Sequence, residues 1–255
     1  MIDILITGAD GFLGKHLIST LKNSKYTFLS FGRENGDVSK VEFWESLPNA
    51  KYLIHLAGNS DVLQSWQSSS KFLIENCNSV TYAIEWAKIH QAKIIFPSSY
   101  IYSKKAKMPV TENSVASPQN PYALSKFLSE KNLEYAYKFF GIQSTVLRFF
   151  NIYGPNQPKG FLIPDILRQL KSANITVKDL SPKRDYLFIE DAIDAIIKSL
   201  NLHKGHHCFN VGSGVSYSVG DVIKLIQENC KTNYNNGENQ IKIILHFHLL
   251  KANIF

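Results

Sequence analysis

Two side chains that could move a proton lie four residues apart in the stretch Tyr122-Ala-Leu-Ser-Lys126. Pro121 precedes them and a helical pattern continues to about residue 138, so we expect both side chains on one face of a helix. A lysine ammonium lowers the pKa of a neighbouring phenol, which would make Tyr122 an acid or base near neutral pH. Ser98, at the end of an apolar strand, would donate a second hydrogen bond to a substrate oxygen. The Tyr-Lys spacing alone is weak, because it also occurs by chance in many helices.

The start of the chain has the pattern of a binding site for a cofactor that could take part in this chemistry. An apolar strand ends at Thr7, three glycines follow at a spacing of three, and an amphipathic stretch continues from them. In a dinucleotide-binding turn, Gly8 allows the tight turn, Gly11 lets a pyrophosphate approach the backbone, and Gly14 lets helix and strand pack closely. The helix N-terminus then offers N–H groups to the anion. The alternative is an ordinary strand–helix connection.

The end of the next expected strand, 26–31, indicates which dinucleotide binds. An acid at this place accepts from the ribose 2′-hydroxyl of NAD, whereas an arginine pairs with the 2′-phosphate of NADP. Arg33 therefore favours NADP(H), and Glu34 beside it leaves NAD as the alternative. Asp37 follows shortly, and its simplest interpretation is the start of a helix over 41–47, with Ser39 close to the cap.

Alternating strands and helices predict an α/β fold with a Rossmann-like doubly wound parallel sheet. We expect further strands over 51–58, 93–96 and 145–150, and helices over 71–89, 121–138 and 219–229. The inward positions expected in the 71–89 helix are Phe72, Ile74, Val80, Ile84 and Ala87. The regular alternation weakens after Pro155. We therefore predict an NAD(P)-binding domain over 1–154 and a small substrate-binding lobe over 155–255, partly interleaved with the core.

Composition limits the class of protein. The net charge of +7 comes without an arginine-rich run among aromatics, so nucleic acid is a poor candidate partner and an anionic nucleotide a good one. Three well-separated cysteines indicate a reducing compartment and no metal spacing. We expect no metal site at His206 and His207, because adjacent side chains of a strand point apart. No apolar run approaches the roughly 20 residues that span a bilayer, and no signal peptide is evident, so we expect a cytoplasmic protein away from membranes.

Five motifs together resemble the extended short-chain dehydrogenase/reductases, and more narrowly their nucleotide-sugar epimerase, dehydratase and reductase group. They are Thr7-Gly-Ala-Asp-Gly-Phe-Leu-Gly14, Ser98-Ser-Tyr-Ile-Tyr102, Tyr122-Ala-Leu-Ser-Lys126, Leu147-Arg-Phe-Phe-Asn-Ile-Tyr-Gly-Pro155 and Arg184-Asp-Tyr-Leu-Phe-Ile-Glu-Asp191. The match covers about residues 1–228. It is specific for the superfamily and weak for the substrate.

The resemblance implies roles by position. Tyr122 would be the catalytic acid/base, Lys126 would bind the nicotinamide ribose, and Ser98 falls on the catalytic Ser/Thr position. The cofactor would also contact a set of loop residues: Gly8, Gly11, Phe12, Leu13, Gly14, Arg33, Asp37, Leu56, Ala57 and Gly58. For the nucleotide-sugar substrate the resemblance implies Ser99, Asn151 and Arg184, the last as the partner of the diphosphate. A surface ion pair between Arg184 and Asp185 is the alternative. The resemblance also implies a homodimer formed through a helix bundle.

Departures from the family pattern narrow the reaction. Related dehydratases place Asp-Glu directly after the catalytic Thr, where this chain has Ser99 and Tyr100. The reductase-epimerase that makes GDP-fucose uses a histidine after its Gly-Pro segment, and residues 155–170 contain none. These departures favour reduction of a 4-keto(-6-deoxy) sugar. A 4-epimerase with tightly held NAD is the alternative.

The C-terminal part departs from the family pattern. From about residue 231 the resemblance fades, and we expect a substrate lobe shorter than is usual in the family. The apolar stretch 241–250 could cover the lobe, form a dimer contact, or be a truncated remnant. A non-catalytic dinucleotide-binding protein is therefore a further alternative, although such a protein has no need of the Tyr-Lys pair.

Overall fold

The computed structural model describes residues 2–103, 105–170 and 175–234, with side chains described up to residue 229. The chain divides into two compact units. Unit 1 comprises residues 1–149 and 192–211, and unit 2 comprises residues 150–191 and 212–255. The predicted 241–250 stretch lies outside the described residues.

Unit 1 is built on a six-stranded parallel sheet in the order β2-β1-β3-β4-β5-β8. Its strands are β1 Ile2–Thr7, β2 Phe28–Phe31, β3 Ala50–His55, β4 Lys93–Ser99, β5 Ser144–Phe149 and β8 His206–Val211. The strand order reverses between β1 and β3. In such sheets ligands bind beyond the carboxyl ends of the strands at this switch point, where Thr7 pairs with His55.

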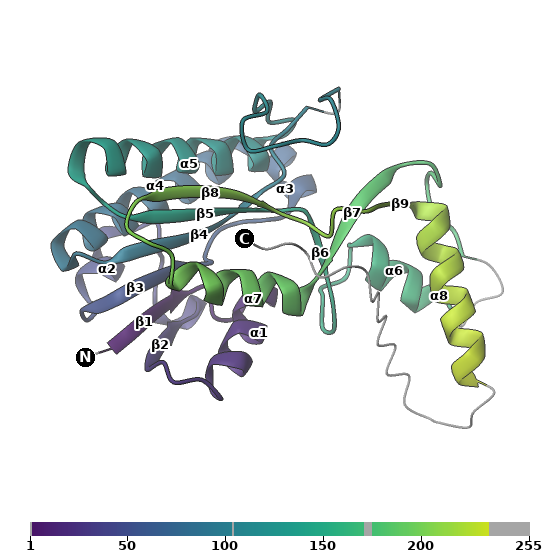
Figure 1. Cartoon of the computed structure of the whole chain (residues 1–255), viewed down its shortest axis with the longest axis horizontal. Coiled ribbons are helices and arrows are strands. Elements are labelled where there is room, and N and C mark those ends of the chain that lie inside the picture. The colour runs from purple at the N-terminus through teal and green to yellow at the C-terminus, as the bar shows by residue number, and fades with distance from the viewer. Residues whose placement is uncertain (1, 104, 171–174, 235–255) are drawn as a thin grey trace. The chain divides into compact units, whose positions relative to one another are not determined.

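Helices cover both faces of the sheet (Figure 1), as a doubly wound fold requires. The helices of unit 1 are α1 Phe12–Leu21, α2 Val41–Glu45, α3 Val62–Gln67, α4 Ser69–His90, α5 Pro121–Phe140 and most of α7 Ile189–Leu200, with a short 3₁₀ turn over Arg33–Asn35. Buried side chains of α2, α4 and α5 pack on one face of the sheet, and α1 and α7 lie on the other. The predicted Rossmann-like fold is thereby confirmed.

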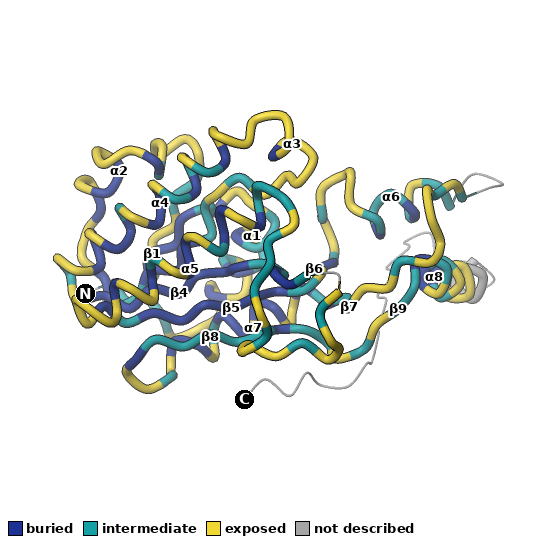
Figure 2. The backbone as a smooth tube through the Cα atoms, turned by 90° about the horizontal axis from the view of Figure 1, so that it is seen from above, coloured by how far each residue is buried: buried dark blue, intermediate teal, exposed yellow. Residues whose placement is uncertain are grey.

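The predicted helix over 71–89 is α4, and four of its five expected inward positions are buried. Ile74 was wrongly predicted to face inward, since 59% of it is exposed. Phe72, Asn76, Val80, Ile84 and Ala87 form the buried stripe, at the three- to four-residue spacing of a helix face. Ile74 lies between two members of this stripe and therefore points outward. Figure 2 shows the same contrast between buried strands and exposed outer helix faces.

Unit 2 holds a three-stranded sheet in the order β6-β7-β9 and two helices. Its elements are β6 Asn151–Tyr153, α6 Leu162–Gln169, β7 Lys183–Phe188, β9 Ser216–Ser218 and α8 Val219–Tyr234. Ser218 and Asp221 form a reciprocal cap at the start of α8: the Asp221 N–H donates to Ser218 Oγ at 3.0 Å and the Asp221 carboxylate accepts the Ser218 N–H at 2.9 Å. Among the described residues, none of the helices combines the length and the apolar character that crossing a bilayer needs.

Candidate active site

The three glycines of the first turn are needed for steric reasons. Gly8 has φ +76°, and a Cβ there would lie 2.6 Å from the Ala57 nitrogen. A Cβ on Gly14 would lie 2.3 Å from the Gly8 carbonyl oxygen, so only glycine lets the helix approach the strand this closely. A Cβ on Gly11 would approach only that same oxygen, at 3.2 Å, and the space beyond it is open. The loop therefore has the shape of a cradle whose open side is at Gly11.

The start of α1 suits an anion. Gly11 is its N-cap residue and provides no side-chain cap, so the first N–H groups, beginning with Phe12 and Leu13, are left to an external acceptor. No acidic side chain occurs in the first turn of α1. A helix N-terminus of this kind stabilises negative charge. The cradle thus fits the pyrophosphate of a nicotinamide dinucleotide.

Sequence reasoning overlooked Asp10, which joins the cradle to the end of β2. Its carboxylate accepts the backbone N–H of Arg33 at 2.8 Å. A Cβ on Gly32 would lie 2.1 Å from the same carboxylate, so this glycine is required by Asp10. Two features of the sequence could have predicted this contact. They are the acid inside the glycine motif and the glycine directly after the second strand. This hydrogen bond fixes the backbone of Arg33 directly after β2.

The two residues expected at the adenosine end lie on the loop after β2. The Arg33 side chain is exposed, as a group that meets a 2′-phosphate must be. The Asp37 carboxylate accepts both the N–H and the hydroxyl of Ser39, at 2.9 and 2.8 Å, and these bonds lower its pKa. The N-cap of α2 is Lys40, so Ser39 closes a turn with Asp37 and does not cap the helix.

The segment after β3 lies directly beside the cradle. The Leu56 N–H donates to the Thr7 carbonyl at 3.1 Å, and the Ala57 N–H lies 3.4 Å from Thr7 Oγ1. Gly58 has φ +152°, and a Cβ there would lie 3.2 Å from the Asn76 side chain. The structure thus brings Leu56, Ala57 and Gly58 to the same sheet edge as the glycine loop.

Tyr122 and Lys126 lie in the first two turns of α5, as the sequence predicted. Asn120 caps this helix by accepting the Ala123 N–H at 2.8 Å, and Gly141 ends it with φ +70°. Burial raises the pKa of Tyr122, and a hydrogen bond with the Ser99 side chain opposes this effect. The net shift of this pKa is upward, opposite to the lowering that the sequence predicted, because desolvation of the phenolate is the largest cause.

Lys126 is buried against the end of β4. Its ammonium group donates to the Pro97 carbonyl at 2.9 Å and lies 4.4 Å from the centre of the Phe96 ring. Burial lowers the pKa of Lys126 to about 8, although the negative charge of Glu130 acts in the opposite direction. The lysine can therefore change its charge slightly above neutral pH.

The structure gives the Ser98 hydroxyl a buried partner. Its hydroxyl donates to the buried carboxylate of Glu130, which is itself ion-paired with Arg148 at 2.7 Å. Ser98 and Arg148 are register partners on β4 and β5, which directs both toward Glu130. Successive side chains of a strand point in opposite directions, so the neighbouring serine points elsewhere. A hydrogen bond with that neighbouring serine, Ser99, lowers the pKa of Tyr122.

Unit 2 brings Asn151 and Arg184 together at a cavity of about 290 Å³. The Asn151 amide donates to the Asp185 carbonyl at 3.0 Å. Arg184 and Asp185 do not form the alternative ion pair. The Asp185 carboxylate instead accepts the N–H groups of Ser213 and Gly214, both at 2.8 Å. Arg184 donates to the Lys183 carbonyl and is exposed.

Two further residues of this cavity were missed by sequence reasoning. Within the described part of the chain, the Tyr186 hydroxyl and Gln157 Oε1 are buried without a hydrogen-bond partner, and both residues line the cavity. An unpaired buried polar atom costs about 1–3 kcal/mol, which a polar ligand can recover. Tyr186 lies inside the motif 184–191, which was the available signal. The cavity therefore offers a guanidinium and two unpaired polar atoms to a ligand, on a lining that is otherwise largely apolar.

The fold and the glycine cradle define a nicotinamide dinucleotide-dependent enzyme of the extended short-chain dehydrogenase/reductase type. Residues 4–212 match the model of the NAD dependent epimerase/dehydratase family. The chain belongs to that family.

Relatives include proteins of different activities. A putative UDP-glucose 4-epimerase of Methanocaldococcus jannaschii is 27% identical, over 88% of this chain and 81% of that protein. GDP-6-deoxy-D-mannose reductase of Pseudomonas aeruginosa is also 27% identical, over 88% and 79%. The solved structure of RMD from Pseudomonas aeruginosa, complexed with NADPH, superimposes with a TM-score of 0.83 at 25% identity, covering 91% of this chain and 84% of that one.

Proposed function

We propose that this NAD(P)-dependent enzyme modifies a nucleotide-diphosphate sugar by reducing its 4-keto group, with NADPH as the reductant. The observation that carries the proposal is the placement of Tyr122 and Lys126 on the first two turns of α5, with the Lys126 ammonium bound to the Pro97 carbonyl of β4. The nicotinamide would supply a hydride to carbon 4 of the sugar. The product is the C4 alcohol, and the cofactor is left oxidised.

In this reaction Tyr122 donates its proton to the carbonyl oxygen as the hydride arrives. Ser99 donates a hydrogen bond to the same oxygen, the role that the sequence had suggested for Ser98. Lys126 would bind the nicotinamide ribose and place positive charge near the phenol. Ser98 holds Glu130 and stays outside the chemistry. The other cofactor contacts remain those of the glycine cradle, Arg33, Asp37 and the segment 56–58.

Arg33 supports reduction over epimerisation, because a preference for NADPH fits a net reduction better than a reaction that returns its hydride to the sugar. The positions that carry an acid pair in related dehydratases hold Ser99 and Tyr100, so loss of water lacks its expected proton donor.

The preference for NADPH rests on Arg33, whose exposed guanidinium can pair with a 2′-phosphate. We expect Arg33→Ala to reduce kcat/KM for NADPH about tenfold and to leave kcat/KM for NADH within about twofold. Arg168 is an exposed arginine of unit 2, and Arg168→Ala serves as the matched control. Equal losses with both cofactors would remove the argument for NADP(H).

In unit 2 we propose that Arg184 and Asn151 bind the diphosphate of the substrate. An exposed guanidinium suits phosphate oxygens, and the unpaired Tyr186 hydroxyl and Gln157 oxygen suit the remaining polar groups of a nucleotide. Arg184→Gln should raise KM for the nucleotide sugar with little change in kcat. A lowered kcat at unchanged KM would argue against a binding role.

The deciding experiment follows NADPH absorbance with a 4-keto-6-deoxy nucleotide sugar. Tyr122→Phe should reduce turnover at least about a thousandfold, and Tyr135→Phe, an exposed tyrosine of the same helix, should keep it. Unchanged turnover in Tyr122→Phe would refute the proposal. Tightly bound NAD in the purified protein, with interconversion of nucleotide sugars and no net cofactor use, would establish the epimerase instead. Dinucleotide binding without turnover of any such substrate would establish a non-catalytic protein.

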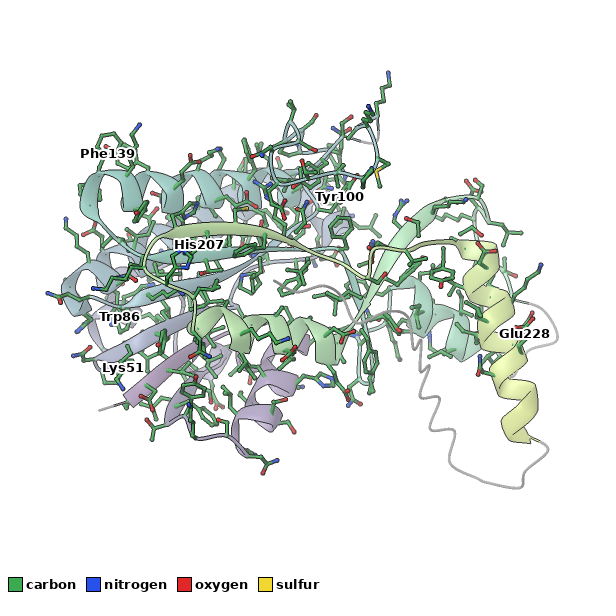
Figure 3. All side chains as sticks on the ribbon, in the orientation of Figure 1. Lys51, Trp86, Tyr100, Phe139, His207 and Glu228 are labelled. Carbon is green, nitrogen blue, oxygen red and sulfur yellow. The ribbon has the colours of Figure 1, made fainter. Side chains whose placement is uncertain are left out.

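We further propose that the enzyme is a homodimer that pairs through α5. Large apolar side chains recur on its outer side at helical spacing and are 37–58% exposed: Leu124, Leu128, Tyr135 and Phe139. Figure 3 shows Phe139 on this helix. Leu128→Lys should convert a dimer to a monomer in light scattering, and Ile89→Lys at the end of α4 is the control. A wild-type monomer would refute this proposal.

A further inference from the structure

Three buried polar side chains follow one another at the switch point of the sheet. Thr7 Oγ1 lies 2.7 Å from His55 Nδ1, and His55 Nε2 lies 3.2 Å from Ser79 Oγ. Ser79 in turn donates to the main-chain carbonyl of Asn76 at 2.9 Å. Each of these residues is at most 4% exposed. The contacts join the end of β1, directly before Gly8, to the end of β3 and to α4.

The same series continues into the helix of Tyr122. The Asn76 amide donates to Ser125 Oγ at 2.9 Å, and the Ser125 hydroxyl donates to the Tyr122 carbonyl at 2.8 Å. Asn76 also accepts the Asn59 N–H at 2.8 Å and donates to the Asn59 carbonyl at 3.1 Å, which ties down the loop after β3. A continuous buried path therefore runs from the glycine loop to the residue before Lys126.

The contacts select one tautomer of His55. If Nε2 carries the proton, three hydrogen bonds form: Thr7 hydroxyl to Nδ1, Nε2–H to Ser79, and Ser79 hydroxyl to the Asn76 carbonyl. If Nδ1 carries the proton, Ser79 must turn its hydroxyl to Nε2. The Asn76 carbonyl then loses that bond, and the Thr7 proton has no acceptor among the described contacts. A buried donor left unpaired costs about 1–3 kcal/mol, so the Nε2–H form is favoured.

The surroundings of His55 keep it neutral. Its ring stacks on Phe96 with centroids 6.2 Å apart and meets the edge of Trp44 at 5.5 Å. Burial is the main cause that lowers its pKa to about 3, and the charge of Lys126 lowers it further. Thr7 and Ser79, which contact its two ring nitrogens, carry no charge to offset this.

We propose that His55, held as the neutral Nε2–H tautomer, is a positioning residue that couples the dinucleotide cradle to the helix carrying Tyr122 and Lys126. Through Thr7 it sets the edge of the cradle next to Ala57, whose N–H points at Thr7 Oγ1. Through Ser79, Asn76 and Ser125 it sets the first turn of α5. This inference rests on the catalytic role proposed above for Tyr122 and Lys126, and its first test is independent of that role.

The first test observes the tautomer directly. In nitrogen-15 NMR of the full chain, His55 should show a protonated Nε2, an unprotonated Nδ1 and no titration between pH 5 and pH 9. A protonated Nδ1, or a pKa inside that range, would overturn the proposal. This result does not depend on turnover of any nucleotide sugar, so it separates the proposal from the proposed reaction.

The second test breaks the path far from the cradle. Ser125→Ala removes the hydroxyl between Asn76 and Tyr122, and we expect a loss in kcat of about tenfold or more and a rise of about threefold in the NADPH dissociation constant. Ser129→Ala is the matched control: its hydroxyl is equally buried on the same helix and donates to the Ser125 carbonyl at 2.9 Å, outside the path. Equal effects of the two substitutions on kcat and on NADPH affinity would show a general packing role and overturn the coupling.

A third variant tests the histidine itself, and a fourth takes its place if the third does not fold. His55→Phe keeps a ring between Trp44 and Phe96 and removes both nitrogens, and it should raise the NADPH dissociation constant about tenfold. If it does not fold, Thr7→Val removes the hydroxyl that contacts His55 at the cradle side of the path and should raise the NADPH dissociation constant by about the same factor. An unchanged NADPH affinity in a folded variant would refute the link to the cradle.

Discussion

The two adjacent serines of β4 offer the sharpest test of the site, because the structure gives them different partners. Ser98→Ala removes one hydrogen bond to the Glu130 carboxylate and should act on stability. A hydrogen bond to a charged group contributes about 1.5–3 kcal/mol. Glu130 keeps three contacts from Arg148, at 3.2, 3.0 and 2.7 Å, so the lower end of that range applies. For a chain of this size we expect Tm to fall by roughly 3–8 °C.

Ser99→Ala should act on catalysis instead. It removes a hydrogen-bond donor beside Tyr122 from the oxygen on which charge develops, an effect of about 10²–10³ in kcat for a well-placed donor. Its effect on stability should be small, since the serine is only half-buried.

The assay pairs NADPH oxidation with urea unfolding for both variants and the wild type. We expect Ser98→Ala to keep kcat within about threefold of the wild type while losing about 1.5–2 kcal/mol of the free energy of unfolding. The reasoning is refuted if Ser98→Ala loses more activity than Ser99→Ala, because Ser98 would then reach the substrate and the contact with Glu130 would not describe its working position.

Three further predictions concern buried charge. Glu130→Gln leaves the Arg148 guanidinium buried without its counter-ion and should lower the free energy of unfolding by about 3–5 kcal/mol in urea titrations; a loss below about 1 kcal/mol would mean that the pair is well hydrated. Because the pKa of His55 is lowered to about 3 in the folded chain, only the unfolded chain takes up its proton as pH falls below 6.5. The free energy of unfolding should therefore fall more steeply with decreasing pH in the wild type than in His55→Phe, by about 0.7 kcal/mol per pH unit at pH 6.5 and by close to about 1.4 at pH 5, and parallel slopes would contradict this. The pKa of about 8 for Lys126 means that its ammonium form predominates below pH 8, so kcat should decline above that pH, and a rate that is constant to pH 10 would speak against a role for its charge.

The sequence by itself determined what depends on local spacing. The glycines at 8, 11 and 14 lie within one strand–turn–helix unit, and their steric roles follow from that unit alone. Tyr122 and Lys126 share a helix face because they are four residues apart, and α5 begins at Pro121 as predicted and ends at Phe140, close to the predicted end. The alternation of strands and helices was enough to predict the parallel sheet.

Only the tertiary structure decided the pairings between distant elements. Whether Ser98 or Ser99 meets Tyr122 depends on the direction of two adjacent side chains on β4 and on Glu130 and Arg148, which come from α5 and β5. Asp10 meets Arg33 across 23 residues, and His55 meets Thr7 across 48. Neither period nor composition encodes such contacts, because they arise only once the strands have taken their order in the sheet. The upward shift of the Tyr122 pKa has the same origin: the neighbouring lysine was visible in the sequence, but the desolvation that raises this pKa is a property of the folded structure.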